Sequence, residues 1–549
     1  MKINRKVLGL VLLAFITINK ISAQKKSKKQ NIIFLLTDDQ RWDALSCMGN
    51  KEISTPNIDK IAEKGVIFTN FYSTTSICMA SRAQMMTGMY EFKTGCNFTH
   101  GPLTKKKFQK SYPVLLRKAG YKTGFTGKFG YAVKENADAK AGYAKMEDLP
   151  VDEFDWWKGW PSQGYYQTAK NKHMVEYAEK HPHVSGALGA ASVDFIKEYS
   201  NKKEPFCLSV SFKAPHNPVS PDPQYDHIYK GKTFTKNPNF GQEGAKHLPK
   251  QSKLGRQYQR LGEHWNAENY DYAMSRYYQL IHGIDVAVGM ILDELEKQGE
   301  ADNTVIIFTT DNGYSTGAHG FGGKVLPYEE GAKGPLLIYA PGSKSENKGW
   351  KSHAITGNID MTPTILDIAG VDIPDNVDGK SLIPLLEKKN ASVKDHQAII
   401  QAWGESPTHS LSVVSDDYKY LYWFYADGME AKEELYNLKE DKYEMNNLAQ
   451  DKSDAKQLKK MQTIYDSYVA RIKKEGAPLN RYIEYGTLYD RHVSWEDKKD
   501  LIKEYIDPSK RKPKKNKKLK KNKKDKKDKK GKKGKKSKKV KKNRTNNSD

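Results

Sequence analysis

Two pairs of polar side chains follow apolar segments of the chain. Asp38 and Asp39 end the run NIIFLLTDD, and Asp311 and Asn312 end the run NTVIIFTTDN. Carboxylates that meet at one place repel one another unless a cation lies among them, and oxygen ligands favour calcium or magnesium over zinc. Each aspartate by itself is typical of a helix cap or a turn. Together, the two pairs predict a metal site.

A cysteine with an arginine four residues later stands in the small, polar segment TTSICMASR. One interpretation is that Cys78 is a packed thiol and Arg82 a surface charge. The other is that the Cys78 thiol is converted into another group. The other cysteines are Cys47, Cys96 and Cys207. If chemistry consumes one of the four, an odd number remains, so no disulfide framework is predicted and these three are interpreted as buried thiols.

The segments that precede these residues predict strands of a buried sheet. NIIFLLTDD, PFCLSVSFKAPH and NTVIIFTTDN are apolar on both faces, which is typical of parallel strands covered on both sides. Apolar residues recur at helical spacing from Ile281 to Leu295, and Gly299 ends that pattern. This order predicts an α/β fold with a large central, mostly parallel sheet sandwiched by helices. Ligands then gather at the carboxyl ends of the strands.

The chain of 549 residues is long enough for more than one folded unit. After about residue 395 it changes to short strand-like pieces and one amphipathic helix, which predict a small α+β subdomain with a short antiparallel sheet. The predicted order is a signal peptide, the α/β domain, this subdomain and a disordered lysine-rich tail, over residues 1–23, 24–395, 396–507 and 508–549.

The first 23 residues have the composition of an export signal. Basic residues precede the apolar run VLGLVLLAFI, and small residues, Ser22 and Ala23, follow it. The run is too short to span a bilayer, and no other segment is long and apolar enough to do so. The sequence therefore predicts an exported protein, periplasmic or extracellular, without a transmembrane segment.

The formal net charge of +26 comes mostly from the C-terminal tail. Residues 508–549 contain 24 Lys or Arg and three Asp, whereas the predicted folded body is nearly neutral. A tail of this composition stays unfolded and acts either as a solubilising segment or as an adhesive for polyanions. Because no aromatic residues are interleaved with the lysines, we expect no nucleic-acid partner.

The segment SICMASR resembles the maturation motif of the type I sulfatases of the alkaline phosphatase-like superfamily, in which the cysteine becomes Cα-formylglycine. The alanine form of that motif is present as Cys78, Ala80 and Arg82. Between about residues 30 and 450, LLTDD, GYKTGFTGK, APHNP, TDNG, GAHG, YEEG and ELYNL follow in the family's order. The chain resembles secreted bacterial polysaccharide sulfatases.

The resemblance implies a maturation enzyme that makes formylglycine from Cys78, and one calcium ion. The implied metal ligands are Asp38, Asp39, residue 78, Asp311 and Asn312. The hydrated aldehyde would carry two hydroxyl groups, of which one attacks sulfur and the other later expels sulfate and restores the aldehyde. A serine or cysteine nucleophile has no second hydroxyl group and cannot expel sulfate in this way.

The resemblance also implies roles for the charged residues around the nucleophile. Arg82 would hold the diol, and Lys128 and Lys324 would bind the sulfate oxygens and spread their charge. His216 would protonate the leaving oxygen of the sugar. His319 would contact sulfate or substrate. By composition alone, each lysine would be a solvated charge and His216 a turn residue.

The chain departs from the family's pattern at two positions. Gly130 stands where many members have a histidine that helps to deprotonate the diol. His100, His319 or Lys128 would take over that role, and His100 is predicted with His319 as a substrate-binding residue. Lys333 stands where an arginine is common, and we interpret it as structural.

The leading hypothesis is an exported sulfatase that acts on a sulfated oligo- or polysaccharide, with an algal polymer of the ulvan or carrageenan type as the favoured substrate. One alternative is a formylglycine phosphodiesterase or phosphonate hydrolase of the same superfamily. Another is a non-catalytic polyanion-binding protein, which the complete set of ligands and lysines argues against. The sequence does not specify the sugar, the position of the sulfate or the oligomeric state.

Overall fold

A computed structural model describes residues 29–137, 144–415, 417–478 and 481–502. These residues belong to one compact unit. The predicted signal peptide and the predicted lysine-rich tail lie outside the described residues. Within the described part, no helix combines the length and the apolar character that crossing a membrane requires.

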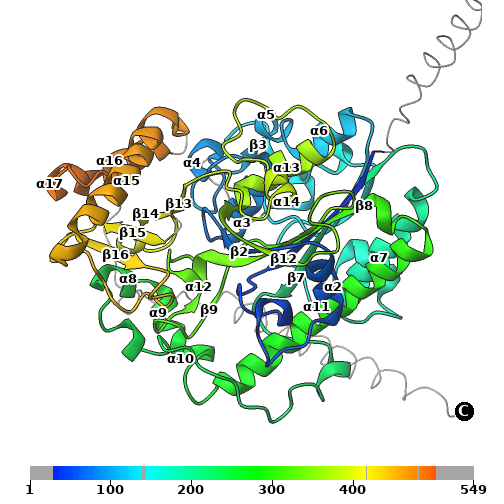
Figure 1. The fold of residues 1–549 in the computed structure, drawn as a ribbon, viewed down its shortest axis with the longest axis horizontal. Coiled ribbons are helices and arrows are strands. Elements are labelled where there is room, and N and C mark those ends of the chain that lie inside the picture. The colour runs from blue at the N-terminus through cyan, green and yellow to red at the C-terminus, as the bar shows by residue number, and fades with distance from the viewer. Residues whose placement is uncertain (1–28, 138–143, 416, 479–480, 503–549) are drawn as a thin grey trace, which may run out of the picture. The chain divides into compact units, whose positions relative to one another are not determined.

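A mostly parallel sheet of eight strands forms the centre of this unit (Figure 1). The strand order is β12-β2-β11-β8-β1-β7-β4-β6, and only β11 runs antiparallel to its neighbours. In that order the strands span Trp350–Gly357, Val66–Tyr72, Lys333–Tyr339, Thr304–Thr310, Asn31–Asp38, Phe206–Pro215, Lys122–Lys128 and Trp156–Trp160.

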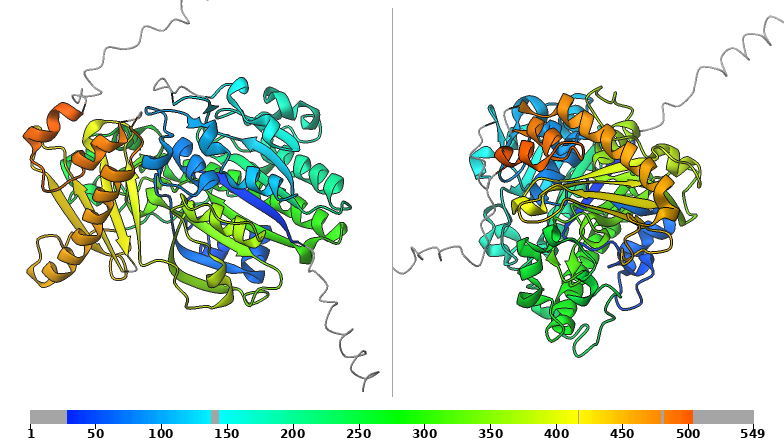
Figure 2. Two further views of the ribbon diagram at one scale, coloured as in Figure 1. Left: turned by 90° about the horizontal axis from the view of Figure 1, so that it is seen from above. Right: turned by 90° about the vertical axis from the view of Figure 1, so that its left-hand side faces the viewer.

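Helices cover both faces of the sheet (Figures 1 and 2). Ile33 and Leu35 of β1 pack into one core, with α2 (Pro56–Lys64), α7 (Val184–Tyr199) and α11 (Tyr270–Lys297). Alternate side chains of β1 point into the second core, which contains residues of α3 (Cys78–Thr87), α6 (Tyr112–Lys118) and α13 (Met361–Ile368). The strand is apolar on both faces because it lies between these two layers.

The central strands β8, β1 and β7 bring their carboxyl ends to one edge of the sheet. The register pairs Thr37 with Thr310 and Asp38 with Pro215, so the polar residues that follow each strand emerge side by side. A long excursion then connects β7 to α11 and includes the short helices α8 (Lys250–Lys253), α9 (Arg256–Gln259) and α10 (Leu261–His264).

The C-terminal part contains a second, antiparallel sheet of four strands, at the left of Figure 1. Its strands β13 to β16 span His396–Gln401, Ser410–Ser415, Tyr418–Trp423 and Lys432–Asn437. Helix α15 (Ala455–Glu475) packs on it through Tyr465, whose ring lies 5.3 Å from that of Tyr420. The predicted fold class, a large mostly parallel sheet plus a small antiparallel one, is confirmed. The domain boundary near residue 395 stays a prediction.

Candidate active site

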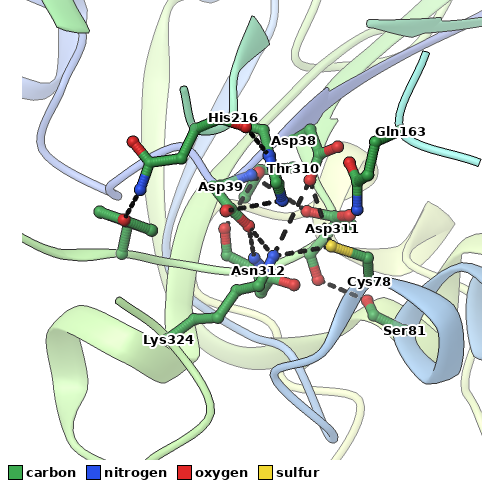
Figure 3. Close-up of polar contacts among 12 residues, drawn as sticks. Asp38, Asp39, Cys78, Ser81, Gln163, His216, Thr310, Asp311, Asn312 and Lys324 are labelled. Carbon is green, nitrogen blue, oxygen red and sulfur yellow. Dashed lines mark hydrogen bonds and ion pairs between the residues drawn. The ribbon is translucent and has the colours of Figure 1, made fainter. Parts of the chain in front are cut away.

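Cys78 is the first residue of helix α3 and is 1% exposed. Its Sγ lies 3.3 Å from Asp38 Oδ1, and the ammonium group of Lys324 is 2.7 Å from the sulfur (Figure 3). Burial raises the pKa of this thiol to about 12, and Asp38 adds to the effect. As a plain thiol the residue is therefore a poor nucleophile at neutral pH, and its Sγ stands for the oxygen that a modified side chain would carry.

Three carboxylates surround Cys78. Potential ligand atoms of Asp38, Asp39, Cys78 and Asp311 all lie within 4.8 Å of one another, and all four residues are buried. Burial opposes the ionisation of Asp38, but nearby cationic groups, Lys128 first, outweigh it and hold the pKa of Asp38 well below its usual value. Burial and the charge of Asp38 raise the pKa of Asp311 to about 6.

These donors fit a hard cation. Asn312 donates from Nδ2 to Asp39 Oδ1 at 2.5 Å, while its own Oδ1 is buried without a hydrogen-bond partner among the described residues. Three carboxylates and an orphaned amide oxygen are the ligand set that calcium and magnesium prefer, and zinc sites of this composition are uncommon. A divalent ion held by Asp38, Asp39, Asp311 and Asn312 would also offset the repulsion among the carboxylates.

Two lysines supply positive charge around the carboxylates. Lys128, at the end of β4 and 1% exposed, donates to Asp38 Oδ2 at 2.5 Å and to Gln163 Oε1 at 2.8 Å. Lys324 contacts Asp39 Oδ1 as well as Cys78. Both predicted sulfate-binding lysines therefore reach the site from distant parts of the sequence.

Arg82 lies one helical turn after Cys78, as predicted, but it bonds to carboxylates. Its Nε donates to Asp311 Oδ2 at 2.9 Å, and its Nη2 lies 3.5 Å from Asp38 Oδ2. Within the part of the chain that the structure describes, no contact joins it to the sulfur of Cys78. In this geometry the guanidinium group positions two predicted metal ligands and neutralises part of their charge.

His216 follows β7. Among the described residues, it is the one predicted histidine that lies near Cys78 and lines the same cavity. Its Nε2 lies 3.7 Å from Asp39 Oδ2, and its side chain is 18% exposed. Burial lowers its pKa to about 4, although Asp38 and Asp39 oppose that shift. The imidazole is thus neutral near pH 7 in the free protein, and a bound anion would raise its pKa.

The other two predicted histidines lie elsewhere. His100 stacks on Tyr482, with ring centroids 4.6 Å apart. His319 is 1% exposed, and its Nε2 is 4.0 Å from both Glu330 Oε2 and Glu444 Oε2. Neither residue lines the cavity at Cys78. The prediction that they contact substrate does not fit this geometry, because both side chains are packed against the C-terminal part of the chain.

The structure also explains the glycine at position 130. Gly130 has φ of 91°, and a Cβ atom there would lie 2.8 Å from Cδ of Arg82. A histidine here would strain the backbone and force Arg82 to shift. Of the three replacements that the sequence left open, Lys128 alone lies at the site. Gln163, whose sequence context gave no signal, contacts that lysine. Lys333 donates to Glu329 and Asn70 away from the nucleophile, as expected for a structural residue.

A cavity of about 450 Å³ opens over Cys78. Asp39, Cys78, His216 and Lys324 lie at its base, and the excursion after β7 contributes Arg256, Arg260, His264 and Trp265 to its wall. Trp403, which follows β13, also lines it. These wall residues could not be predicted from the sequence, because they belong to polar, irregular segments without a periodic pattern.

Comparisons with known proteins agree with this geometry. The family model "Sulfatase" matches residues 30–371, and the model "N-sulphoglucosamine sulphohydrolase, C-terminal" matches residues 317–469. An N-acetylglucosamine-6-O-sulfatase of Bacteroides thetaiotaomicron is 30% identical over 86% of this chain and 92% of its own length. An ulvan-active sulfatase of Formosa agariphila is 26% identical over 70% of each chain.

A similar solved structure is a complex of a protein with its substrate D-glucosamine-2-N,6-O-disulfate. It has a TM-score of 0.64 and 25% sequence identity, and the match covers 82% of this chain and 98% of that one. The similarity therefore includes the α/β part and most of the C-terminal part of the described chain.

Proposed function

The chain belongs to the sulfatase family and is a sulfuric ester hydrolase that acts on sulfated carbohydrates, and we propose that it is an exported, formylglycine-dependent enzyme with one calcium ion. The observation that carries this proposal is the position of Cys78. This residue starts a buried helix, lies between Asp38 and Lys324, and faces the cavity. An unmodified thiol with a raised pKa is a poor nucleophile in these surroundings. A modified side chain would be stabilised by the same charged, preorganised groups during the reaction.

The modified residue and the cation would supply an activated hydroxyl nucleophile. The chain's own residues then bind and orient the substrate. We assign to Lys128 and Lys324 the role of binding sulfate oxygens and stabilising the negative charge that grows in the transition state. Gln163 orients Lys128 through a 2.8 Å hydrogen bond, and Arg82 holds the carboxylates in position through its ion pairs.

We assign the proton transfer to the leaving alcohol to His216. His216 lines the same cavity as Cys78 and Lys324. A sugar alkoxide is a poor leaving group, so a proton delivered to its oxygen lowers the barrier. The sulfate of the substrate adds negative charge next to the imidazole and raises its pKa from the low value of the free protein.

The substrate is a sulfated sugar, and two types are favoured. An amino sugar with a 6-sulfate is favoured by the B. thetaiotaomicron relative, which matches this chain over most of both lengths. An algal polysaccharide of the ulvan type is favoured by the F. agariphila relative. Assays of sulfate release from 6-sulfated N-acetylglucosamine and from ulvan oligosaccharides distinguish the two.

Mass spectrometry of the tryptic peptide that contains residue 78 tests the proposal directly. The protein is produced in a host that has a formylglycine-generating enzyme. We expect an aldehyde at position 78, together with sulfate release from a sulfated sugar by the same preparation. An unmodified thiol in fully active protein contradicts the formylglycine mechanism. Faster hydrolysis of an aryl phosphate or phosphonate ester than of the matched sulfate ester favours the phosphodiesterase alternative.

A further inference from the structure

A second group of buried side chains, away from Cys78, has the composition of a metal site. Ligand atoms of His319, Glu330 and Glu444 all lie within 4.8 Å of one another. His319 Nε2 is 4.0 Å from Glu330 Oε2 and 4.0 Å from Glu444 Oε2. The three side chains are almost completely buried, and none of them lines the cavity above Cys78. We call these three residues the His319 cluster.

The imidazole of His319 presents a lone pair to the two carboxylates. Its Nδ1 lies 3.0 Å from the backbone oxygen of Gly244, which can only accept a hydrogen bond, so Nδ1 carries a proton. In the neutral ring, Nε2 is then an acceptor, and it has no hydrogen-bond partner among the described residues. A ligand histidine usually has this arrangement, in which one ring nitrogen donates to a backbone carbonyl and the other binds the metal.

The carboxylates of the His319 cluster lack a matching positive charge. Glu330 Oε1 accepts a hydrogen bond from Asn239 Nδ2 at 2.7 Å, but Glu330 Oε2 has no hydrogen-bond partner among the described residues. Lys419 Nζ lies 2.9 Å from Glu444 Oε1, but it also pairs with Glu329 at 2.7 Å and donates to a backbone oxygen. Its three protons are therefore used away from Glu444 Oε2. Three buried acceptor atoms thus face one another, which is costly unless a cation or a proton lies among them.

The donor set of the His319 cluster favours zinc. One imidazole nitrogen and two carboxylate oxygens are ligands that zinc accepts together, whereas calcium and magnesium prefer oxygen ligands alone. Donors that share one zinc ion lie roughly 3–4 Å apart, so small side-chain movements from the observed 4.0 Å would form the site. The oxygen ligands beside Cys78 fit calcium instead, so the two sites differ in the ion that they prefer.

The His319 cluster also joins two parts of the chain. His319 and Glu330 stand on either side of Lys324 in the sequence, and Lys324 contacts Cys78. Glu444 follows β16 of the antiparallel sheet. A cation held by all three residues therefore fastens both ends of the segment that carries Lys324 to the C-terminal part of the chain.

We propose that His319, Glu330 and Glu444 bind one zinc ion, which ties the segment that carries Lys324 to the C-terminal part of the chain. The role of this ion is structural, and its site is separate from the proposed calcium site. The proposal goes beyond the proposed function, because zinc binding needs neither formylglycine nor turnover.

Zinc binding to calcium-saturated Cys78→Ala protein tests the site. Calcium fills the oxygen ligands at the nucleophile, and the substitution removes the thiol that could hold zinc there. After gel filtration, metal analysis should find about one equivalent of zinc, and zinc should raise the melting temperature because it binds the native state. No retained zinc, or no thermal response, overturns the site, as expected if the cluster holds a proton instead of a metal.

The added changes His319→Gln and Glu330→Gln locate the ion. Each is expected to weaken zinc binding by at least about tenfold. His216→Ala is the matched control, because His216 is the histidine beside the active-site carboxylates. It should bind zinc as tightly as Cys78→Ala protein does. Loss of zinc in the His216 variant, with retention in the His319 variant, overturns the proposal, and circular dichroism checks that each variant is folded.

X-ray absorption by zinc gives a test that does not depend on the folding of the His319 and Glu330 variants. Zinc bound to the Cys78→Ala, His216→Ala protein should have one imidazole among nitrogen and oxygen ligands, and the absence of imidazole overturns the site. An unmutated enzyme that binds zinc in this way but releases no sulfate contradicts only the proposed function. An active enzyme that binds no zinc refutes only the zinc site.

Discussion

The base and the wall of the cavity above Cys78 differ in how they hold charge. Beneath the base, Asp38 and Lys128 are almost completely buried and bonded to each other, at the carboxyl ends of β1 and β4, which lie on either side of β7. The wall consists of short helices and turns, and Arg260 and Trp403 are partly exposed there. A rigid base can preorganise charges for the reaction, and a wall on loops can vary with the substrate. We infer that chemistry is determined at the base and specificity at the wall.

We expect the replacement of Cys78, at the base of the cavity, to have the largest effect on activity. Cys78→Ala removes the cysteine of the proposed maturation motif, so kcat on every sulfate ester should fall by roughly four orders of magnitude or more. Because the side chain is small, the midpoint of thermal unfolding should change little. Initial rates and a thermal melt measure both quantities. Appreciable residual activity would falsify the aldehyde mechanism.

Removing the metal should have the next largest effect. A chelator is expected to abolish turnover, and added calcium should restore it. Calcium should also raise the melting temperature of the chelated protein, because an ion that binds the native state stabilises it. Asp311→Asn is the matched variant and should lose this thermal response. Full activity in metal-stripped protein contradicts a role for the cation.

His216→Ala should separate the reaction from substrate binding. Loss of the proton donor is expected to lower kcat on a sugar sulfate by roughly 10²–10⁴-fold. The loss should be much smaller on an aryl sulfate, because a phenolate leaves without help. His282→Ala is the control, since His282 lies in α11 against Tyr225, outside the cavity. Equal losses on both substrates count against the assignment of His216 as the acid.

Removal of the lysine-rich tail should have the smallest effect. Deleting residues 508–549 is expected to leave kcat/KM on a small sulfate ester unchanged. Binding to an immobilised sulfated polymer should weaken, and the difference should shrink at high salt because the attraction is electrostatic. A large loss of activity on the small ester would show that the tail contributes to the folded protein.

The sequence contained most of what was needed for the central sheet. The runs that became β1 and β8 are buried along their whole length, and the amphipathic pattern after Ile281 lies in α11. The antiparallel orientation of β11 was not predicted, because an apolar strand carries no local signal of its direction. The second sheet was predicted from short strand-like segments, and β13 and β15 coincide with them.

The three predicted histidines differ in how far the sequence indicated their positions in the fold. His216 was predicted at this edge because it directly follows a strand, and its Nε2 lies 3.7 Å from Asp39 Oδ2. His100 and His319 lie in irregular segments, and their side chains turn toward Tyr482 and Glu444 instead. The close approach of Arg82 to Gly130 also required coordinates, because the two residues are far apart in the chain.

The sequence by itself indicated Cys78 as a candidate nucleophile precursor and predicted the carboxylate pairs and the layered fold, because hydrophobic patterns and short motifs are local properties of the chain. Only the tertiary structure decided which lysines and histidines meet Cys78, and that Arg256, Arg260 and Trp403 face the same cavity. These contacts depend on the path of long, irregular connections. The polar residues of those connections carry no periodic signal of where they will pack.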